Sequence, residues 1–149
     1  MMQDIGGCRS IVRNVAQVRK IVANYEKSDI KHKVFQTDDY IDKPKESGYR
    51  GVHLIFKYFS DKNETYNGLK IEVQVRSNLQ HAWATAVETT GTFIGQALKS
   101  SQGEADWLRF FCLMGSAIAI RENTNPVPDT PTSRYKLRTN CVDMQSCWT

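Results

Sequence analysis

The stretch YRGVHLIFKYF, residues 49–59, alternates between two kinds of side chain. One parity holds Val52, Leu54, Phe56 and Tyr58, and the other holds Tyr49, Gly51, His53, Ile55 and Lys57. A period of two residues is the mark of a β-strand with one buried face. The sequence therefore predicts a strand over residues 49–59.

A second stretch, LKIEVQVR at residues 69–76, repeats this pattern more cleanly. Leu69, Ile71, Val73 and Val75 share one face, and Lys70, Glu72, Gln74 and Arg76 share the other. The connecting residues SDKNETYNG are typical of a turn, so the two strands are predicted to form an antiparallel hairpin.

The remaining periodicity predicts an α+β domain of order β-α-β-β-α-α, with helices packed on a small mixed sheet. A chain of 149 residues fits one domain with a single core. The other predicted elements are a strand at 8–12, helices at 15–25, 79–98 and 104–123, a polar loop ending near residue 40, and a Pro-containing polar tail at 126–149 after a domain at 1–125.

Composition narrows the class of protein. The net charge of +4 suits an anionic ligand but is far from that of a dedicated duplex binder. The longest apolar run, residues 110–120, is too short to cross a bilayer, so no membrane partner is expected. Four cysteines without a paired spacing favour a reduced, cytoplasmic protein.

The hairpin also gathers polar groups. If both strands share a core, one sheet face carries Tyr49, His53, Glu72, Gln74 and Arg76, and the loop that holds Lys45 can fold over it. A solvated sheet face is the plain alternative. The functional interpretation is phosphoryl transfer involving a nucleotide, because rings stack on bases, cations bind phosphates, and carboxylates such as Asp4 and Glu72 hold Mg²⁺.

These residues resemble a known family. The motifs DIGGCR at 4–9, DYIDKPKESGYRGVH at 39–53, IEVQVR at 71–76 and LQHAWA at 79–84 are similar to the synthetase domain of RelA/SpoT alarmone synthetases. The resemblance runs from residue 4 to about residue 98, and the helix at 104–123 resembles the last helix of small single-domain members. It implies a nucleotidyltransferase-like mixed sheet flanked by helices and a transfer of pyrophosphate from ATP to the 3′-hydroxyl of GDP or GTP.

The resemblance also implies roles for individual residues. Asp4 and Glu72 would bind Mg²⁺, and Glu72 would also act as the base toward the acceptor hydroxyl. Arg9 would stack on adenine and Tyr49 on guanine. The remaining matches are Lys45 and His53, which would contact acceptor phosphates, and Gln74 and Arg76, which would line the same cleft.

One departure from the family concerns the amino terminus. Only three residues precede Asp4, whereas family members carry an upstream segment that grips the ATP phosphates, so an incomplete domain with weak or no activity is expected. Two alternatives stay open: a toxin-type relative that modifies the 3′ end of tRNA, and an inactive guanine-nucleotide-binding fragment. Small members often assemble, so a homo-oligomer is also among the expected partners.

Overall fold

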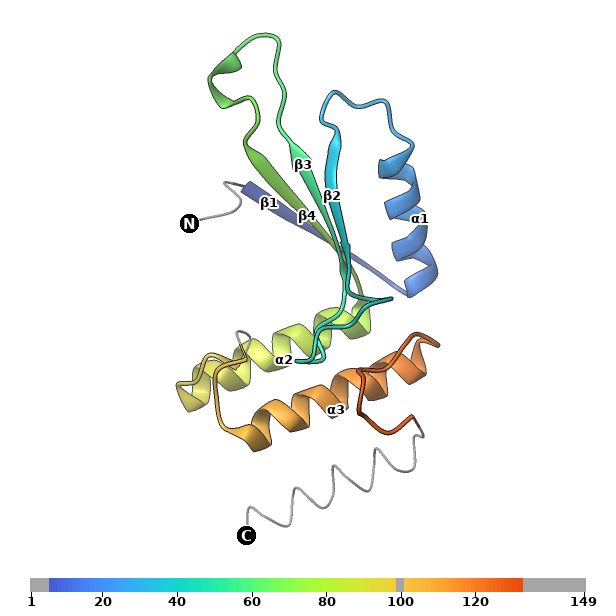
Figure 1. The fold of residues 1–149 in the computed structure, drawn as a ribbon, viewed down its shortest axis with the longest axis vertical. Coiled ribbons are helices and arrows are strands. Elements are labelled where there is room, and N and C mark those ends of the chain that lie inside the picture. The colour runs from blue at the N-terminus through green and yellow to red at the C-terminus, as the bar shows by residue number, and fades with distance from the viewer. Residues whose placement is uncertain (1–5, 99–100, 133–149) are drawn as a thin grey trace. The chain divides into compact units, whose positions relative to one another are not determined.

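The structure is a computed structural model that describes residues 6–98 and 101–132 (Figure 1). These residues divide into two compact units. The first comprises residues 6–39 and 51–78, and the second comprises residues 40–50, 79–98 and 101–132. Each unit is described by itself.

The first unit is built on a mixed four-stranded sheet of strand order β1-β4-β3-β2 (Figure 1). β1 runs parallel to β4, while β2–β3 and β3–β4 are antiparallel pairs. The strands are β1 (Gly6–Val12), β2 (Val34–Asp39), β3 (Val52–Lys57) and β4 (Lys70–Ser77). The predicted mixed sheet and its central antiparallel hairpin are thus confirmed.

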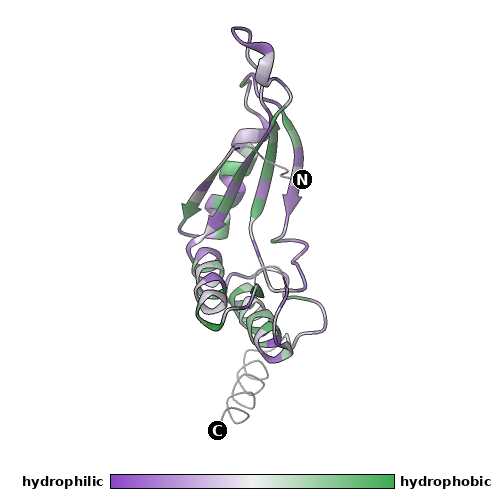
Figure 2. Cartoon of the chain, turned by 90° about the vertical axis from the view of Figure 1, so that its left-hand side faces the viewer, coloured by the Kyte–Doolittle hydropathy of each residue, from purple (hydrophilic) through white to green (hydrophobic). Residues whose placement is uncertain are grey.

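One face of this sheet forms the core of the unit. Helix α1 (Val15–Glu26) packs against β4, β1 and β3, and its Tyr25 ring meets the Phe56 ring edge-on at 5.6 Å. The buried residues are Val18 and Val22 on α1, Val52, Leu54 and Phe56 on β3, and Val73 and Val75 on β4. The alternation predicted for both hairpin strands is confirmed, and it is visible as alternating colour along the strands in Figure 2.

Strand β2 was not expected, because a polar loop was predicted up to about residue 40. Its sequence, VFQTDD, lacks alternation, and most of its residues are half-buried or exposed. β2 lies at the edge of the sheet, where pairing with β3 supplies hydrogen bonds without requiring an apolar face. A register shift between Val34 and Gln36 leaves Phe35 as the extra residue of a β-bulge.

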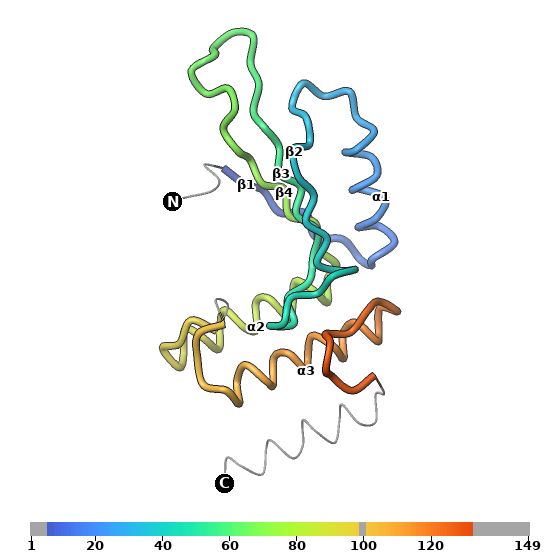
Figure 3. The backbone as a smooth tube through the Cα atoms, viewed as in Figure 1, coloured from blue at the N-terminus to red at the C-terminus, as the bar shows by residue number. Residues whose placement is uncertain are grey.

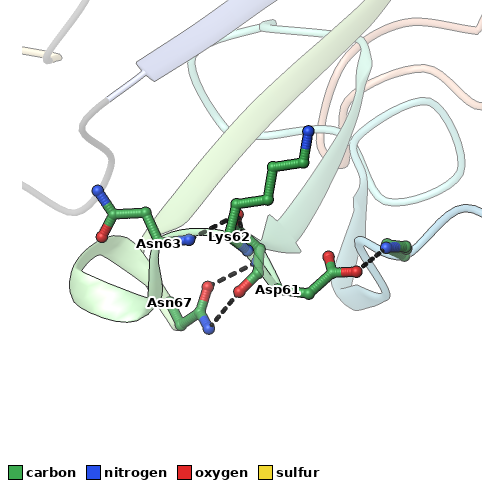
Figure 4. A network of polar contacts seen from close by, with 6 residues as sticks. Asp61, Lys62, Asn63 and Asn67 are labelled. Carbon is green, nitrogen blue, oxygen red and sulfur yellow. Dashed lines mark hydrogen bonds and ion pairs between the residues drawn. The ribbon is translucent and has the colours of Figure 1, made fainter.

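The β3–β4 hairpin ends in a structured tip, which can be followed in Figure 3. Ser60 and Asn67 hold it through two bonds, from Ser60 N–H to Asn67 Oδ1 at 2.7 Å and from Asn67 Nδ2 to Ser60 O at 3.0 Å (Figure 4). Ser60 Oγ also accepts the backbone N–H groups of Lys62 and Asn63. These bonds satisfy the polar backbone of a connection that is long for a hairpin.

The second unit contains α2 (Asn78–Ile94) and α3 (Ala105–Arg121). Its core cluster comprises Tyr49, Trp83, Ala84, Val87, Leu98 and Phe111, with Trp107 and Phe110 packed against it. These aromatic side chains therefore form the core between residues 40–50, α2 and α3. α2 ends four residues before the predicted Leu98, because Gly95 takes a left-handed φ of +67° and Gln96 N–H bonds the Gly91 carbonyl at 2.9 Å.

Candidate functional site

The polar face of the sheet carries a connected group of side chains that we call the Glu72 cluster: Arg9, His53, Glu72, Gln74 and Arg76. The strand register explains it, because His53 and Arg9 are both Cα partners of Gln74, on opposite sides of β4. Glu72 and Arg76 flank Gln74 at two-residue spacing on the same strand. The predicted shared face for His53, Glu72, Gln74 and Arg76 is therefore confirmed.

Gln74 connects the cations of this cluster to the carboxylate. Its Oε1 accepts Arg76 Nη2 at 2.7 Å and Arg9 Nε at 3.4 Å, and its Nε2 donates to Glu72 Oε2 at 2.6 Å. The orientation of the amide is fixed, because its Oε1 accepts from two guanidinium groups and its Nε2 donates to a carboxylate. Gln74 thus aligns the carboxylate of Glu72 through its amide nitrogen.

Glu72 is held at both carboxylate oxygens. His53 Nδ1 lies 2.6 Å from Glu72 Oε1, while Gln74 occupies the other oxygen. The side chains of His53 and Glu72 are only 12% and 21% exposed, so the pair is largely shielded from water. Because each carboxylate oxygen has two lone-pair directions, Glu72 still has acceptor capacity for a proton or a metal ion.

Of the two carboxylates predicted to bind a metal ion, the structure describes Glu72, while Asp4 lies outside the described residues. Cys141 and Cys147, which are not predicted ligands, also lie outside them. Across residues 6–98 and 101–132, no group of three His, Cys, Asp or Glu side chains is arranged to hold a metal ion. This donor set fits Mg²⁺ rather than a metal held wholly by protein, since Mg²⁺ typically takes one or two carboxylates together with substrate phosphates.

Two further predicted site residues, Lys45 and Tyr49, lie on the segment 40–50 of the second unit. The prediction that Tyr49 stands on the strand is wrong, because β3 begins at Val52 and Tyr49 is only 9% exposed. Its ring packs edge-on against Tyr40 at 5.7 Å and Trp83 at 6.2 Å. Lys45 Nζ lies 4.3 Å from the centroid of the Tyr40 ring and 5.4 Å from that of Tyr49. Tyr40, which the sequence analysis did not single out, therefore shares this cation.

Glycine fixes the path of the segment that holds Lys45 and Tyr49. Gly48 has φ +92°, and its N–H closes a turn onto the Lys45 carbonyl at 2.9 Å. A Cβ built on Gly48 would meet the Phe111 carbonyl oxygen at 2.8 Å, and one on Gly115 would meet the Gly48 carbonyl oxygen at 2.5 Å. The segment therefore lies directly on the backbone of α3, an approach that only glycine permits.

Arg50 is a second residue that the sequence analysis missed, and it anchors the same segment. It is 2% exposed, and its guanidinium donates to the carbonyls of Gly115 at 3.3 Å and Ile41 at 3.4 Å, and to the Asn125 carbonyl. Burial lowers the pKa of Arg50 to about 10, so the group still carries its charge at neutral pH. Its only sequence signal is its place between Tyr49 and Gly51, which does not reveal burial.

The fold of these elements is that of the small alarmone synthetases. The crystal structure of small alarmone synthetase 1 from Bacillus subtilis bound to its product pppGpp matches with a TM-score of 0.69 and 22% sequence identity, over 82% of this chain and 60% of that one. At this level of identity the likeness establishes the fold. The predicted fold class is therefore confirmed.

Membership of a family follows from the sequence match. Residues 1–92 match the family described as a region found in RelA / SpoT proteins, which is more than half of the 149 residues. The chain therefore belongs to the RelA/SpoT family, as the motifs predicted.

Two curated relatives from Bacillus subtilis (strain 168) are named GTP pyrophosphokinases. This chain is 30% identical to GTP pyrophosphokinase YwaC over 84 residues and 36% identical to GTP pyrophosphokinase YjbM over 87 residues. Each match covers 56% of this chain, and 40% and 39% of the two relatives. The chain thus spans about two fifths of their length. Among its described residues, no helix has the length and apolar character needed to span a bilayer.

Proposed function

We propose that the protein transfers a pyrophosphate group from ATP to the 3′-hydroxyl of GDP or GTP. Its family and the names of its relatives support this class of reaction. The observation that carries the proposal is the Glu72 carboxylate, aligned on a largely shielded sheet face by His53 and Gln74. A positioned carboxylate of this kind is what a general base toward a ribose hydroxyl requires.

Glu72 takes the proton of the acceptor 3′-hydroxyl in the proposed step. The 3′ oxygen forms a bond to the β-phosphorus of ATP, and the bond from that phosphorus to the α–β bridging oxygen breaks. AMP leaves with the electron pair of that bond. Asp4 and Glu72 would hold Mg²⁺ in this proposal, and the ion would neutralise phosphate charge.

The other residues of the Glu72 cluster bind and orient the two nucleotides. Arg9 stacks on the adenine of ATP, and His53 contacts acceptor phosphates. Because His53 Nδ1 faces Glu72, this contact must come from Nε2. Gln74 and Arg76 line the same cleft in this proposal, and Gln74 also aligns Glu72 through its amide nitrogen.

Lys45 and Tyr49 bind the guanine nucleotide in the proposal. The ammonium of Lys45 lies over the rings of Tyr40 and Tyr49, so guanine stacking on Tyr49 requires Lys45 to leave the ring. A nearby phosphate gives the ammonium a stronger partner than an aromatic face. The transfer of Lys45 from ring to phosphate would then couple recognition of the base to recognition of the tail.

The experiment compares Glu72→Gln with the parent chain, using labelled ATP with GDP, GTP or bulk tRNA as acceptor. Glu72→Gln keeps the size of the side chain and removes its basicity, so turnover should fall by roughly 10²–10⁴ while circular dichroism is unchanged. Glu64→Gln, at an exposed position of the hairpin tip, is the matched control and should leave turnover intact. Near-full turnover by Glu72→Gln would remove Glu72 from this role. Label on tRNA rather than on GDP or GTP would identify the acceptor as tRNA.

Two further expectations stay predictions. The cytoplasmic location and the homo-oligomer are testable by fractionation and by sedimentation of the purified protein.

A further inference from the structure

Two lysines face each other across the β3–β4 ladder. Lys57 and Lys70 are direct Cα partners in the antiparallel register. Like charges at directly opposite positions destabilise a sheet. Among the residues that the structure describes, neither ammonium group has a carboxylate or hydrogen-bond partner. The pair therefore needs an explanation other than cross-strand stability.

An aromatic ring from a third strand meets both ammonium groups. Phe35, the extra residue of the β2 bulge, lies with its ring centroid 4.0 Å from Lys57 Nζ and 5.4 Å from Lys70 Nζ. The ring is 50% exposed, so part of it stays open to solvent. Bulges commonly redirect a side chain next to a functional site. Three strands thus bring two cations and one ring to a single place.

This group lies on the same sheet face as the Glu72 cluster. Lys70 precedes Glu72 by two residues on β4, and Lys57 follows His53 by four residues on β3. Because Lys57 pairs with Lys70 and His53 with Gln74, all four side chains lie on one face of the sheet. Two residues of strand span roughly 7 Å. Both oxygens of Glu72 already contact His53 and Gln74, and neither lysine forms an ion pair with that carboxylate.

We propose that Phe35, Lys57 and Lys70 form a subsite that binds a phosphoanhydride group. Two ammonium groups offset most of the negative charge of a diphosphate, and the exposed part of the Phe35 ring offers an apolar surface to the group attached to it. The subsite rests on the proposed function where the phosphoanhydride is the tail of a nucleotide substrate. Free pyrophosphate contains the same phosphoanhydride group. Separate measurements with inorganic pyrophosphate and with GTP distinguish it from a nucleotide tail.

Calorimetry with inorganic pyrophosphate and with GTP, at low and constant ionic strength, tests the subsite in the full chain. The variants are Lys57→Gln, Lys70→Gln and the double substitution, and the control is the pair Lys20→Gln and Lys62→Gln. Lys20 lies on α1 and Lys62 at the hairpin tip (Figure 4), and both are exposed. Each single substitution of a subsite lysine should weaken binding about tenfold, because losing one hydrogen bond to a charged group costs about as much free energy as a tenfold change in affinity. The control pair should stay within about twofold of the parent chain, because both of its ammonium groups are exposed and screened by salt, and only Lys57 and Lys70 meet the Phe35 ring among the described residues.

The outcomes divide as follows. Lysine-dependent binding of both probes supports a general phosphoanhydride subsite, and dependence for GTP alone assigns it to a nucleotide tail. Equal loss in the control pair, or binding that is indifferent to Lys57 and Lys70, overturns the proposal. Turnover of the parent chain, measured separately with labelled ATP, keeps the tests apart. Lysine-dependent pyrophosphate binding by a parent chain that shows no turnover supports the subsite while the proposed function fails, and turnover with lysine-independent binding gives the reverse.

Discussion

Replacement of Gly48 by alanine should destabilise the second unit, and the size of the loss can be worked out from two separate contributions. The first is backbone strain, because Gly48 has φ +92°, where an L-residue costs about 1–2 kcal/mol. The second is overpacking, because a Cβ would lie 2.8 Å from the Phe111 carbonyl oxygen and 3.1 Å from Cys112 Cα. Both atoms belong to a helix backbone and cannot rotate away as a side chain would, so we take the cost of overpacking as about 2–3 kcal/mol.

Two other glycines of the same unit separate these contributions. Gly95 also has a left-handed φ, +67°, but a Cβ there would meet nothing within 4 Å, so Gly95→Ala should cost about 1 kcal/mol from strain alone. Gly115 lies within α3, and a Cβ there would meet the Gly48 carbonyl oxygen at 2.5 Å. In Gly115→Ala, overpacking should therefore lower the free energy of unfolding, and the better helix propensity of alanine should offset about 1 kcal/mol of that loss. The free energy of unfolding should fall most in Gly48→Ala, by about 4 kcal/mol.

Urea unfolding followed by tryptophan fluorescence measures all three variants in one assay, because Trp83 and Trp107 belong to the core of this unit. Guanine-nucleotide affinity should fall in Gly48→Ala at temperatures where the variant remains folded, since Lys45 and Tyr49 lie on the displaced segment. Equal destabilisation by Gly48→Ala and Gly95→Ala would refute the reasoning, because it would show that the segment does not lie on the backbone of α3.

Two more predictions concern buried groups of this unit. Arg50→Met leaves several buried carbonyl oxygens without their donor, so it should lower the free energy of unfolding by about 3 kcal/mol, whereas Arg121→Met at an exposed position should change it by less than about 0.5 kcal/mol; similar losses in both would contradict the anchoring role. Burial raises the pKa of the Cys112 thiol, and Cys8 is exposed, so iodoacetamide at pH 8 should modify Cys8 well before Cys112 in peptide mass maps, and the reverse order would contradict the burial.

The placement of the candidate site residues on the sheet could be predicted from sequence because two neighbouring strands had to share one core. Alternation placed Val52, Leu54 and Val75 on the buried side, and it thereby placed His53 and Glu72 together on the other side. No knowledge of distant contacts was needed. The network that Gln74 builds was not predictable in detail, since bonds among polar side chains depend on rotamers that alternation leaves open.

The edge strand β2 was not predicted, because it lacks the buried face that produces alternation in the hairpin strands. Its residues gain hydrogen bonds from β3 but bury little surface, so its sequence carries no periodic apolar signal. The bulge at Phe35 breaks the period further. The edge position of β2 and its bulge also place Phe35 beside Lys57 and Lys70. The proposed phosphoanhydride subsite therefore could not be predicted from sequence periodicity.

Residues 40–50 show why alternation misplaced Tyr49. Tyr49 has the parity of His53, but its position is set by Gly48, Arg50 and their contacts with α3, which lies some 65 residues further along the chain. Gly51, with φ +150°, lies between Tyr49 and the start of β3 at Val52, so the strand geometry that links parity to face does not reach Tyr49. The positions of the residues in this segment follow from the helices that hold it, while the position of Glu72 follows from the sheet. Variants at Gly48 and Glu72 should therefore separate, with the first acting on guanine-nucleotide affinity and the second on turnover at saturating nucleotide.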